Sequence, residues 1–267
     1  MTIGKQLKLG FRTYFSAIGF IFSKGLWWAF VFPIILNVLL FIGGYKLIES
    51  VTTDLQDWIT CRIGIGEGDF FLSNYLSGFI SGVIWFLLKV MFFFVFAYWG
   101  GYITLILLSP LFAYLSERTE EIISGKKYPF NPYQFMRDIV RGVLISFRNL
   151  FIQTGWMILF FILGFIPVIG WFGAIVLFVL SAYFYGFSFI DYTNERRKMK
   201  ISQSIQFVRS CKWLAVANGI IFSFFLLVPF CGVLFSGFAG IVSVVAATLA
   251  VNEIQSPSQA PACQQIG

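Results

Sequence analysis

The side chains that could do chemistry in this chain are mostly basic residues placed beside apolar segments. Lys24 precedes Gly25 and Leu26, which begin an uncharged run that extends to Tyr45. Backbone N–H groups at a helix start carry about half a positive charge and can bind an anion. Lys24, Gly25 and Leu26 are therefore candidate anion-binding residues, and the same sequence also fits a plain boundary at which the chain enters a membrane.

A second set of polar residues could line a water-filled path. Arg137 and Arg141 are four residues apart, so they share one face of a helix and could concentrate anions at the mouth of such a path. Asn37 lies within the first uncharged run, where its amide either contacts a pore or hydrogen-bonds a neighbouring helix. These three residues are candidates for the pore or its mouth.

Several residue types that enzymes and metal sites need are missing. The sequence contains no histidine, so a serine such as Ser188 lacks its usual catalytic base. The four cysteines do not have metal-ligand spacing, and no nucleotide-binding motif occurs. The uncharged runs also lack the carboxylates that proton-driven transporters carry within the membrane. We therefore predict no enzyme activity, no cofactor, no metal, and a passive route for any transported ion.

The composition places these residues in an integral membrane protein. Hydrophobic residues make up 58% of the chain and charged residues 12%, whereas a soluble domain carries about 25% charged residues. The net charge of +7 comes from basic residues beside apolar runs. Such residues set the orientation of a protein in the lipid bilayer, so we expect lipid and not nucleic acid around this chain.

Two long uncharged stretches, residues 149–190 and 213–252, are each interrupted by a Pro-x-x-Gly sequence, beginning at Pro167 and Pro229. One membrane span needs about 20 apolar residues, and each stretch is roughly twice that length. Proline ends or kinks a helix, so each stretch is predicted to form a hairpin of two helices. The first stretch has basic residues at both outer ends, so both ends of that hairpin are expected on the cytoplasmic side.

The depth of the hairpins stays open between two architectures, six full spans or two hairpins that enter the membrane part way. The first arms, residues 150–166 and 213–228, are about 24 to 26 Å long at roughly 1.5 Å per residue. The hydrocarbon core is about 30 Å thick, so their length favours partial insertion. Irregular backbone at that depth must be buried in protein or line a water-filled cavity.

The rest of the chain completes this all-α plan. We expect a surface helix over residues 4–24, a first span over 25–45, an acidic outer loop over 46–69 and a second apolar stretch over 70–116. That stretch continues as a helix that stops at Ser124 and Gly125, and an amphipathic helix follows within 126–148. The expected membrane domain spans residues 1–253, and residues 254–267 are expected to form a disordered tail.

Several short motifs, in order and spacing, resemble those of the CysZ sulfate-permease family, which shares a domain with the eukaryotic etoposide-induced membrane proteins. The resemblance covers about residues 10–250. The motifs are Gly25-Leu26 before Pro33 and Asn37; Ser109-Pro110-Leu111-Phe112 with Leu115, Ser116 and Glu117; Arg137-Asp138 with Arg141; Ile166-Pro167-Val168-Ile169-Gly170; Ser181-Ala182; and Asp191-Tyr192.

The resemblance implies a multi-pass protein of the bacterial inner membrane with both termini in the cytoplasm. It implies two long transmembrane helices, two re-entrant helical hairpins, a homo-oligomer and entry of sulfate for cysteine synthesis. Glu117 and Asp191 join the pore candidates on this basis. A non-conducting membrane interaction or assembly protein with the same fold, and a channel for another small anion, are the alternatives.

The chain departs from the family at one position. In the family, the Gly-Leu pair is followed by arginines that resemble an anion site, whereas Trp27 and Trp28 follow it here. The bidentate grip that arginine offers an anion is therefore missing at this place. The two tryptophans are typical of anchors at a membrane interface.

Overall fold

In the computed structural model, the described residues are 1–63, 79, 82–83, 85–87, 89–90, 102–125, 132–163, 167–226, 228 and 231–255. Helices account for all the regular structure in these ranges, which confirms the all-α prediction. Their bounds are α1 (Ile3–Ser23), the short 3-10 helix η1 (Trp27–Phe30), α2 (Val31–Ile63), α4 (Ser109–Ser124), α5 (Pro132–Leu163), α6 (Pro167–Arg196), α7 (Ile201–Ser210), α8 (Lys212–Leu226) and α9 (Cys231–Gln255).

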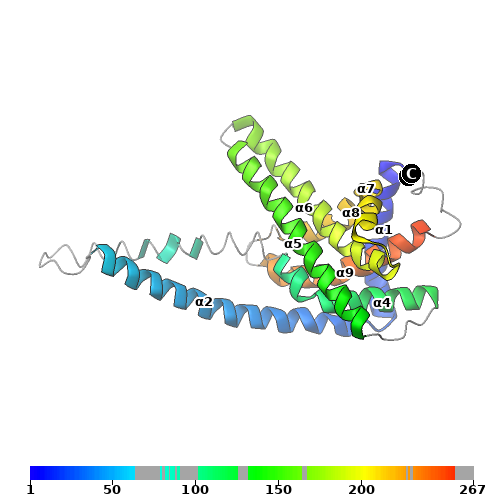
Figure 1. Ribbon diagram of the computed structural model, residues 1–267, viewed down its shortest axis with the longest axis horizontal. Helices are drawn as coiled ribbons and strands as arrows, with labels where there is room; N and C mark the ends of the chain where they lie inside the picture. The colour runs from blue at the N-terminus through cyan, green and yellow to red at the C-terminus, as the bar shows by residue number, and fades with distance from the viewer. Residues whose placement is uncertain are drawn as a thin grey trace, which may run out of the picture.

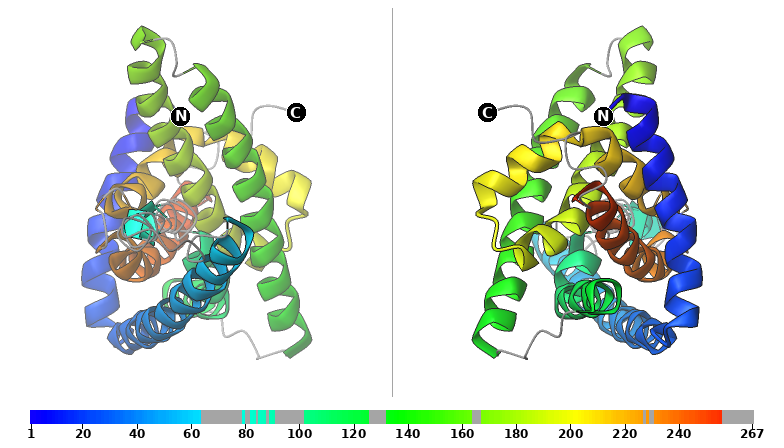
Figure 2. Two further views of the ribbon diagram at one scale, coloured as in Figure 1. Left: turned by 90° about the vertical axis from the view of Figure 1, so that its left-hand side faces the viewer. Right: turned by 90° about the vertical axis from the view of Figure 1, so that its right-hand side faces the viewer.

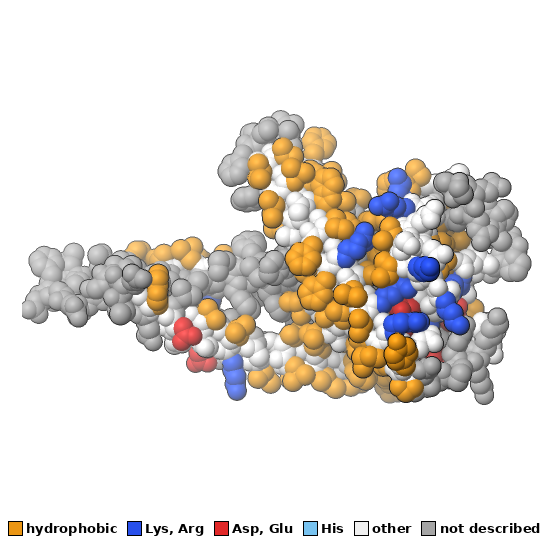
Figure 3. Space-filling model, in the orientation of Figure 1, with side chains coloured by type: hydrophobic (Ala, Val, Ile, Leu, Met, Phe, Trp, Pro, Cys, Tyr) orange, Lys and Arg blue, Asp and Glu red, His pale blue; other side chains and the backbone are white. Residues whose placement is uncertain are grey.

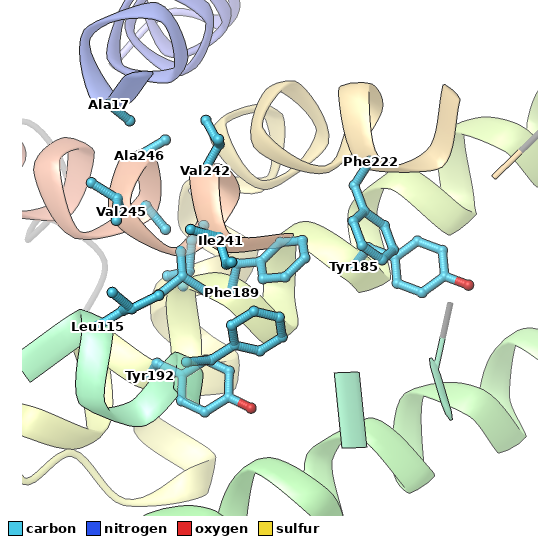
Figure 4. Packing of buried hydrophobic residues seen from close by; sticks show 14 of the residues in the cluster. Ala17, Leu115, Tyr185, Phe189, Tyr192, Phe222, Ile241, Val242, Val245 and Ala246 are labelled. Carbon is cyan, nitrogen blue, oxygen red and sulfur yellow. The ribbon is translucent and has the colours of Figure 1, made fainter. Parts of the chain in front are cut away.

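The helices form one packed body with two projections (Figure 1). α9 lies at the centre of the body, where it contacts α1, α4, α6 and α8. α2 projects away from the body in one direction and the tip of the α5–α6 hairpin in another (Figure 1), and the hairpin tip also stands out at the top of both views in Figure 2. The core joins aromatic rings of α6 and α8 to small residues of α9 (Figure 4). Phe222 contacts Tyr185 and Phe189 there, with ring centroids 4.8 and 5.2 Å apart.

α6 and α8 approach each other unusually closely because each helix has a glycine at the crossing. A Cβ atom at Gly186 would lie 1.8 Å from the carbonyl oxygen of Ala215, and one at Gly219 would lie 1.9 Å from that of Ala182. Real side chains never approach backbone atoms so closely. Small residues that let two backbones meet are typical of helix pairs in membranes.

Three described helical segments are long and apolar enough to cross a membrane: Pro132–Phe160, Phe172–Arg196 and Phe235–Gln255. A fourth candidate is the bent pair formed by Ile3–Ser23 and Trp27–Leu40. Apolar side chains cover the hairpin and the part of α2 next to the body, whereas basic side chains gather over the body itself (Figure 3). An outer surface of this kind belongs in lipid.

Both predicted hairpin breaks are confirmed. α5 ends at Leu163 and α6 begins at Pro167, and α8 ends at Leu226 before α9 begins at Cys231. Pro167 is the first residue of its helix, where proline is tolerated because its missing N–H would have no partner in any case. α5 and α6 run side by side from the tip of their hairpin (Figure 1).

Two sequence expectations were wrong. Residues 46–63 are not a loop, because α2 continues through them to Ile63 without a glycine or proline to stop it. Glu67 and Asp69, the rest of the predicted acidic loop, lie outside the described residues. The amphipathic helix predicted before the first hairpin is not separate either, since α5 runs unbroken from Pro132 into the membrane-type segment.

The ends of α1 and α4 lie within one residue of the predicted ones. The helix predicted to continue without a break into α4 does not, because α4 begins at Ser109 after a turn at Leu108. α4 ends at Ser124 as predicted, because Gly125 takes a positive φ of 68° and its N–H caps the Glu121 carbonyl. α1 ends at Ser23, and the chain turns by 104° before the next helices. α9 continues to Gln255, and residues 256–267, which include most of the predicted disordered tail, lie outside the described residues.

Candidate functional site

A group of charged side chains is buried where α4, α5, α6 and α7 converge. Three arginines and five carboxylates lie within ion-pair distance of one another there, and Asp138, Asp191 and Glu195 are at most 3% exposed. We call this group the charge cluster. Its members are Glu117, Glu120, Asp138, Arg141, Asp191, Glu195, Arg196 and Arg197.

Arg141 of α5 links three helices through Asp191 of α6. Its Nε and Nη2 donate to the two carboxylate oxygens of Asp191 at 3.0 and 2.9 Å, and its Nη1 donates to the Met199 carbonyl at 2.5 Å. Ser204 of α7 also donates to Asp191, and Glu195 Oε2 lies 3.7 Å from Arg141 Nε. A bidentate pair of this kind fixes both distance and orientation, so it holds α5, α6 and α7 together.

Arg196, the last residue of α6, joins α4 to α5. Its Nη1 lies 2.9 Å from Glu117 Oε2, and its Nη2 lies 2.8 Å from Asp138 Oδ2 and donates to the Ala113 carbonyl at 3.3 Å. The Asp138 contact is an ion pair without hydrogen-bond geometry. Burial raises the pKa of the Glu117 carboxyl above its usual range, and the Arg196 charge opposes that shift.

Each arginine of the charge cluster forms ion pairs with carboxylates of the same cluster. Arg197 Nε lies 3.7 Å from Glu120 Oε1, and its Nη2 donates to Asn252 at 2.8 Å. With five carboxylates for three arginines, the cluster holds no surplus positive charge. The arginines of the cluster are therefore not available to bind an anion.

Other cations line a cavity of about 830 Å³ beside the cluster, between α5 and the start of α7. Arg137, Lys198 and Lys200 line it and form no ion pair with the part of the chain that the structure describes. Lys198 takes a positive φ of 57°, which turns the chain sharply at the end of α6. Ile201 and Ser202 also line the cavity, so the positive end of α7 adds to its field. We call it the basic cavity.

Polar groups continue from the cluster along the interface of α5 and α6. Asn149 Nδ2 donates to Ser188 Oγ at 3.0 Å, and Gln153 Nε2 donates to Ser181 Oγ at 2.7 Å. Tyr102 donates to Gln153 Oε1 at 2.5 Å. Asn149, Gln153 and Tyr102 are at most 2% exposed. We call these five residues the polar seam, which is a row of buried donors and acceptors leading away from the basic cavity.

The first predicted anion site lies elsewhere, at the bend between α1 and η1. The N–H of Gly25 points to the Phe22 carbonyl at 3.5 Å, and that of Leu26 donates to the Ile21 carbonyl at 2.9 Å. Both donors are thus used to end α1, and Gly25 has the positive φ of 71° that such a helix end requires. The exposed Lys24 side chain is the group there that an anion could still meet.

The structure brings together four of the five predicted pore residues. Glu117, Arg141 and Asp191 belong to the charge cluster, and Arg137 lines the adjoining basic cavity. Asn37 does not join them, because α2 packs mainly on η1 and α9.

Sequence reasoning missed the other members of the charge cluster and of the basic cavity, part of the polar seam, and Ser204. The missed residues are Glu120, Asp138, Glu195, Arg196, Arg197, Lys198, Lys200, Ser204, Tyr102, Asn149 and Ser188. Spacings such as that from Asp191 to Glu195, one helical turn apart, were the available signal. In the described residues no group of three or more His, Cys, Asp or Glu side chains is placed to hold a metal ion.

Comparisons with known proteins give the chain its family. Residues 13–236 match the family described as sulfate transporter CysZ/etoposide-induced protein 2.4. A sulfate transporter CysZ from Vibrio parahaemolyticus is 24% identical over 86% of this chain and 90% of its own length. Proteins of the same name from Vibrio atlanticus and Pseudomonas syringae are each 26% identical, over 86% and 78% of this chain and 88% and 79% of their own. The match spans most of the chain and confirms the resemblance of its motifs, so the chain belongs to the sulfate transporter CysZ/etoposide-induced protein 2.4 family.

Proposed function

We propose that this chain is a non-enzymatic, passive channel for a small inorganic anion, with sulfate for assimilation as the first candidate. Its relatives carry the name sulfate transporter CysZ. The basic cavity is the observation that carries the proposal, because Arg137, Lys198 and Lys200 line it without an ion pair among the described residues. Glu195, the one carboxylate in its lining, is 3% exposed and pairs with Arg141. Unpaired cations that face one cavity raise the local concentration of anions.

The polar seam supplies the next step of the proposed path. A dianion cannot cross hydrocarbon without donors to replace its water shell. Asn149 and Gln153 offer amide donors, and Tyr102 and the two serines offer hydroxyl groups. These groups are bonded to one another in this conformation, so conduction requires α5 and α6 to separate there and exchange those bonds for bonds to the ion.

The proposed topology has two long transmembrane helices and two hairpins that enter the bilayer part way from the cytoplasm. α8 has 15 residues, or about 22 Å at roughly 1.5 Å per residue, which is less than a hydrocarbon core of about 30 Å. In the proposed topology, both termini lie in the cytoplasm, on the inner side of the bacterial inner membrane. The proposed membrane domain comprises residues 1–253.

The proposed assembly is a homo-oligomer. The part of α2 next to the body exposes an apolar face that includes Ile35, Leu39 and Ile42, each at least half exposed. An exposed apolar face of this kind needs lipid or another protein over it. A second copy of the chain would cover part of it, and lipid the rest.

The topology has its own test. Cysteine introduced at Ile162 or Val228, near the two hairpin tips, is expected to resist a membrane-impermeant maleimide added from the periplasmic side of intact cells. The readout is mass spectrometry of the labelled peptide. Glu49→Cys on α2 is the comparison, since the proposed topology carries that end of α2 to the periplasmic side. Labelling at the hairpin tips equal to that at Glu49→Cys would replace partial insertion with full crossing.

Sulfate flux tests the function. The full chain in liposomes is expected to admit radiolabelled sulfate, and replacing Arg137, Lys198 and Lys200 by alanine should lower the initial rate by about tenfold, the low end of electrostatic focusing. The matched control replaces three exposed lysines outside the cavity, Lys5, Lys8 and Lys46, and should keep the rate within about twofold of the wild type.

Two outcomes of the flux experiment oppose the proposal. Uptake that depends on an imposed pH gradient would contradict the passive route. Liposomes that stay closed to sulfate and to other small anions would favour the alternative, a membrane interaction or assembly protein with the same fold.

A further inference from the structure

We propose that the cavity between α6 and α8 binds one anionic phospholipid, with its phosphate between Arg209 and Lys212. The cavity has a volume of about 450 Å³, within the range of about 300 to 1,000 Å³ of sites for small molecules. It lies apart from the basic cavity, and its lining residues are not shared with the charge cluster. The inference rests on the chain being a membrane protein and does not depend on anion conduction.

The lining has the two-part chemistry of a lipid. Its inner wall is apolar and consists of Val179 and Leu180 of α6 and Val216 of α8. Two cations lie at one end, Arg209 in the last turn of α7 and Lys212 at the start of α8. An apolar wall beside paired cations fits an acyl chain beside a phosphate, whereas a free anion would gain nothing from the wall.

The two cations are available to a ligand. Neither Arg209 nor Lys212 forms an ion pair with the described residues, and no carboxylate is among the residues that line the cavity. A buried carboxylate partner of the kind that occupies Arg141 is thus absent from this part of the described chain. The positive field of both side chains is directed to whatever enters the cavity from the membrane surface.

Two aromatic rings mark the level of the headgroup. Tyr183 and Trp213 also line the cavity, and the Lys212 ammonium lies 5.9 Å from the centroid of the Trp213 ring. Tyrosine and tryptophan concentrate at membrane interfaces, where one end of each ring is apolar and the other polar. Basic pockets between membrane helices on the cytoplasmic side bind the headgroups of anionic lipids.

The test measures lipid retention by the full chain in native mass spectrometry. With phosphatidylglycerol and phosphatidylcholine supplied equally, the wild type should retain one phosphatidylglycerol. The double variant Arg209→Ala with Lys212→Ala should bind it about 10- to 30-fold more weakly, since each cation near an anionic surface contributes roughly fivefold. The charge-keeping variant Arg209→Lys with Lys212→Arg should retain it.

Two controls make the outcome decisive. Lys5→Ala with Lys8→Ala removes the same charge from an exposed face of α1 and should leave retention unchanged. Glycerol phosphate, which has the phosphate but no acyl chain, should fail to displace the lipid at equal concentration. Equal retention of both lipids, an equal loss in the α1 control, or full displacement by glycerol phosphate would each overturn the proposal.

Discussion

Replacing Gly219 by alanine is expected to lower the melting temperature of the full chain in detergent by about 6 to 12 °C. The new methyl group would lie 1.9 Å from the carbonyl oxygen of Ala182 and 2.7 Å from the backbone nitrogen of Gly186. Both atoms are backbone, so no rotamer change relieves the overlap and α6 and α8 must move apart. Overpacking of this severity costs about 3 kcal/mol, and about 2 to 4 °C corresponds to each kcal/mol in a chain of this size.

The same substitution at Gly155 is the matched control. Nothing lies within 4 Å of a Cβ atom built at Gly155, which is also in the interior of a helix. Alanine is a better helix former than glycine by about 1 kcal/mol, so Gly155→Ala should leave the melting temperature unchanged or raise it. Equal losses in Gly155→Ala and Gly219→Ala would mean that the close crossing of α6 and α8 is not what Gly219 supports.

These two glycines show where prediction from sequence ends. The break before Pro167 and the break between α8 and α9 were predictable, because proline in the sequence limits how far the preceding helix can extend. Gly155 and Gly219 look alike in the sequence, since each sits in an apolar run. They differ in their surroundings, because Gly219 packs against the backbone of α6 and Gly155 faces open space. The contact between α6 and α8 joins residues that are far apart in the sequence, so no local pattern predicts it. Secondary structure was therefore accessible from local signals, and packing was not.

The candidate site divides in the same way. Arg137 and Arg141 were predictable because a helical spacing of four residues places them on one face. Arg196 was interpreted as a basic flank that orients the membrane segment, whereas the structure pairs it with Glu117 and Asp138. An arginine that flanks a membrane segment and an arginine in a buried ion pair look the same in the sequence. Arg196 finds its carboxylate partners only because α4 and α5 pack against the end of α6. The prediction for residues 46–63 was wrong for a different reason. The charged residues of this segment predicted a loop, but the segment has no glycine or proline to end the helix, so α2 continues through it.

Replacing Arg141 by alanine is expected to destabilise the protein by about 3 to 5 kcal/mol, the usual cost of breaking a buried ion pair. The substitution leaves the Asp191 carboxylate, which is 2% exposed, without its bidentate partner, and it also removes a hydrogen bond to the Met199 carbonyl. Ser204 alone cannot compensate a buried negative charge. The measurement is the free energy of unfolding in mixed detergent micelles, with Arg137→Ala, an exposed arginine without an ion pair, as the control.

A double-mutant cycle separates the pair from its surroundings. Arg141→Ala combined with Asp191→Asn removes both charges of the bidentate pair, whereas Glu195 loses its Arg141 partner equally in the single and the double variant. The double variant should therefore be more stable than the sum of the single losses predicts, with a coupling energy of about 1 to 3 kcal/mol. Additive losses would show that the two side chains act independently. In that case, the link between α5 and α6 would rest on the uncharged bonds of the polar seam, which Arg141 does not touch.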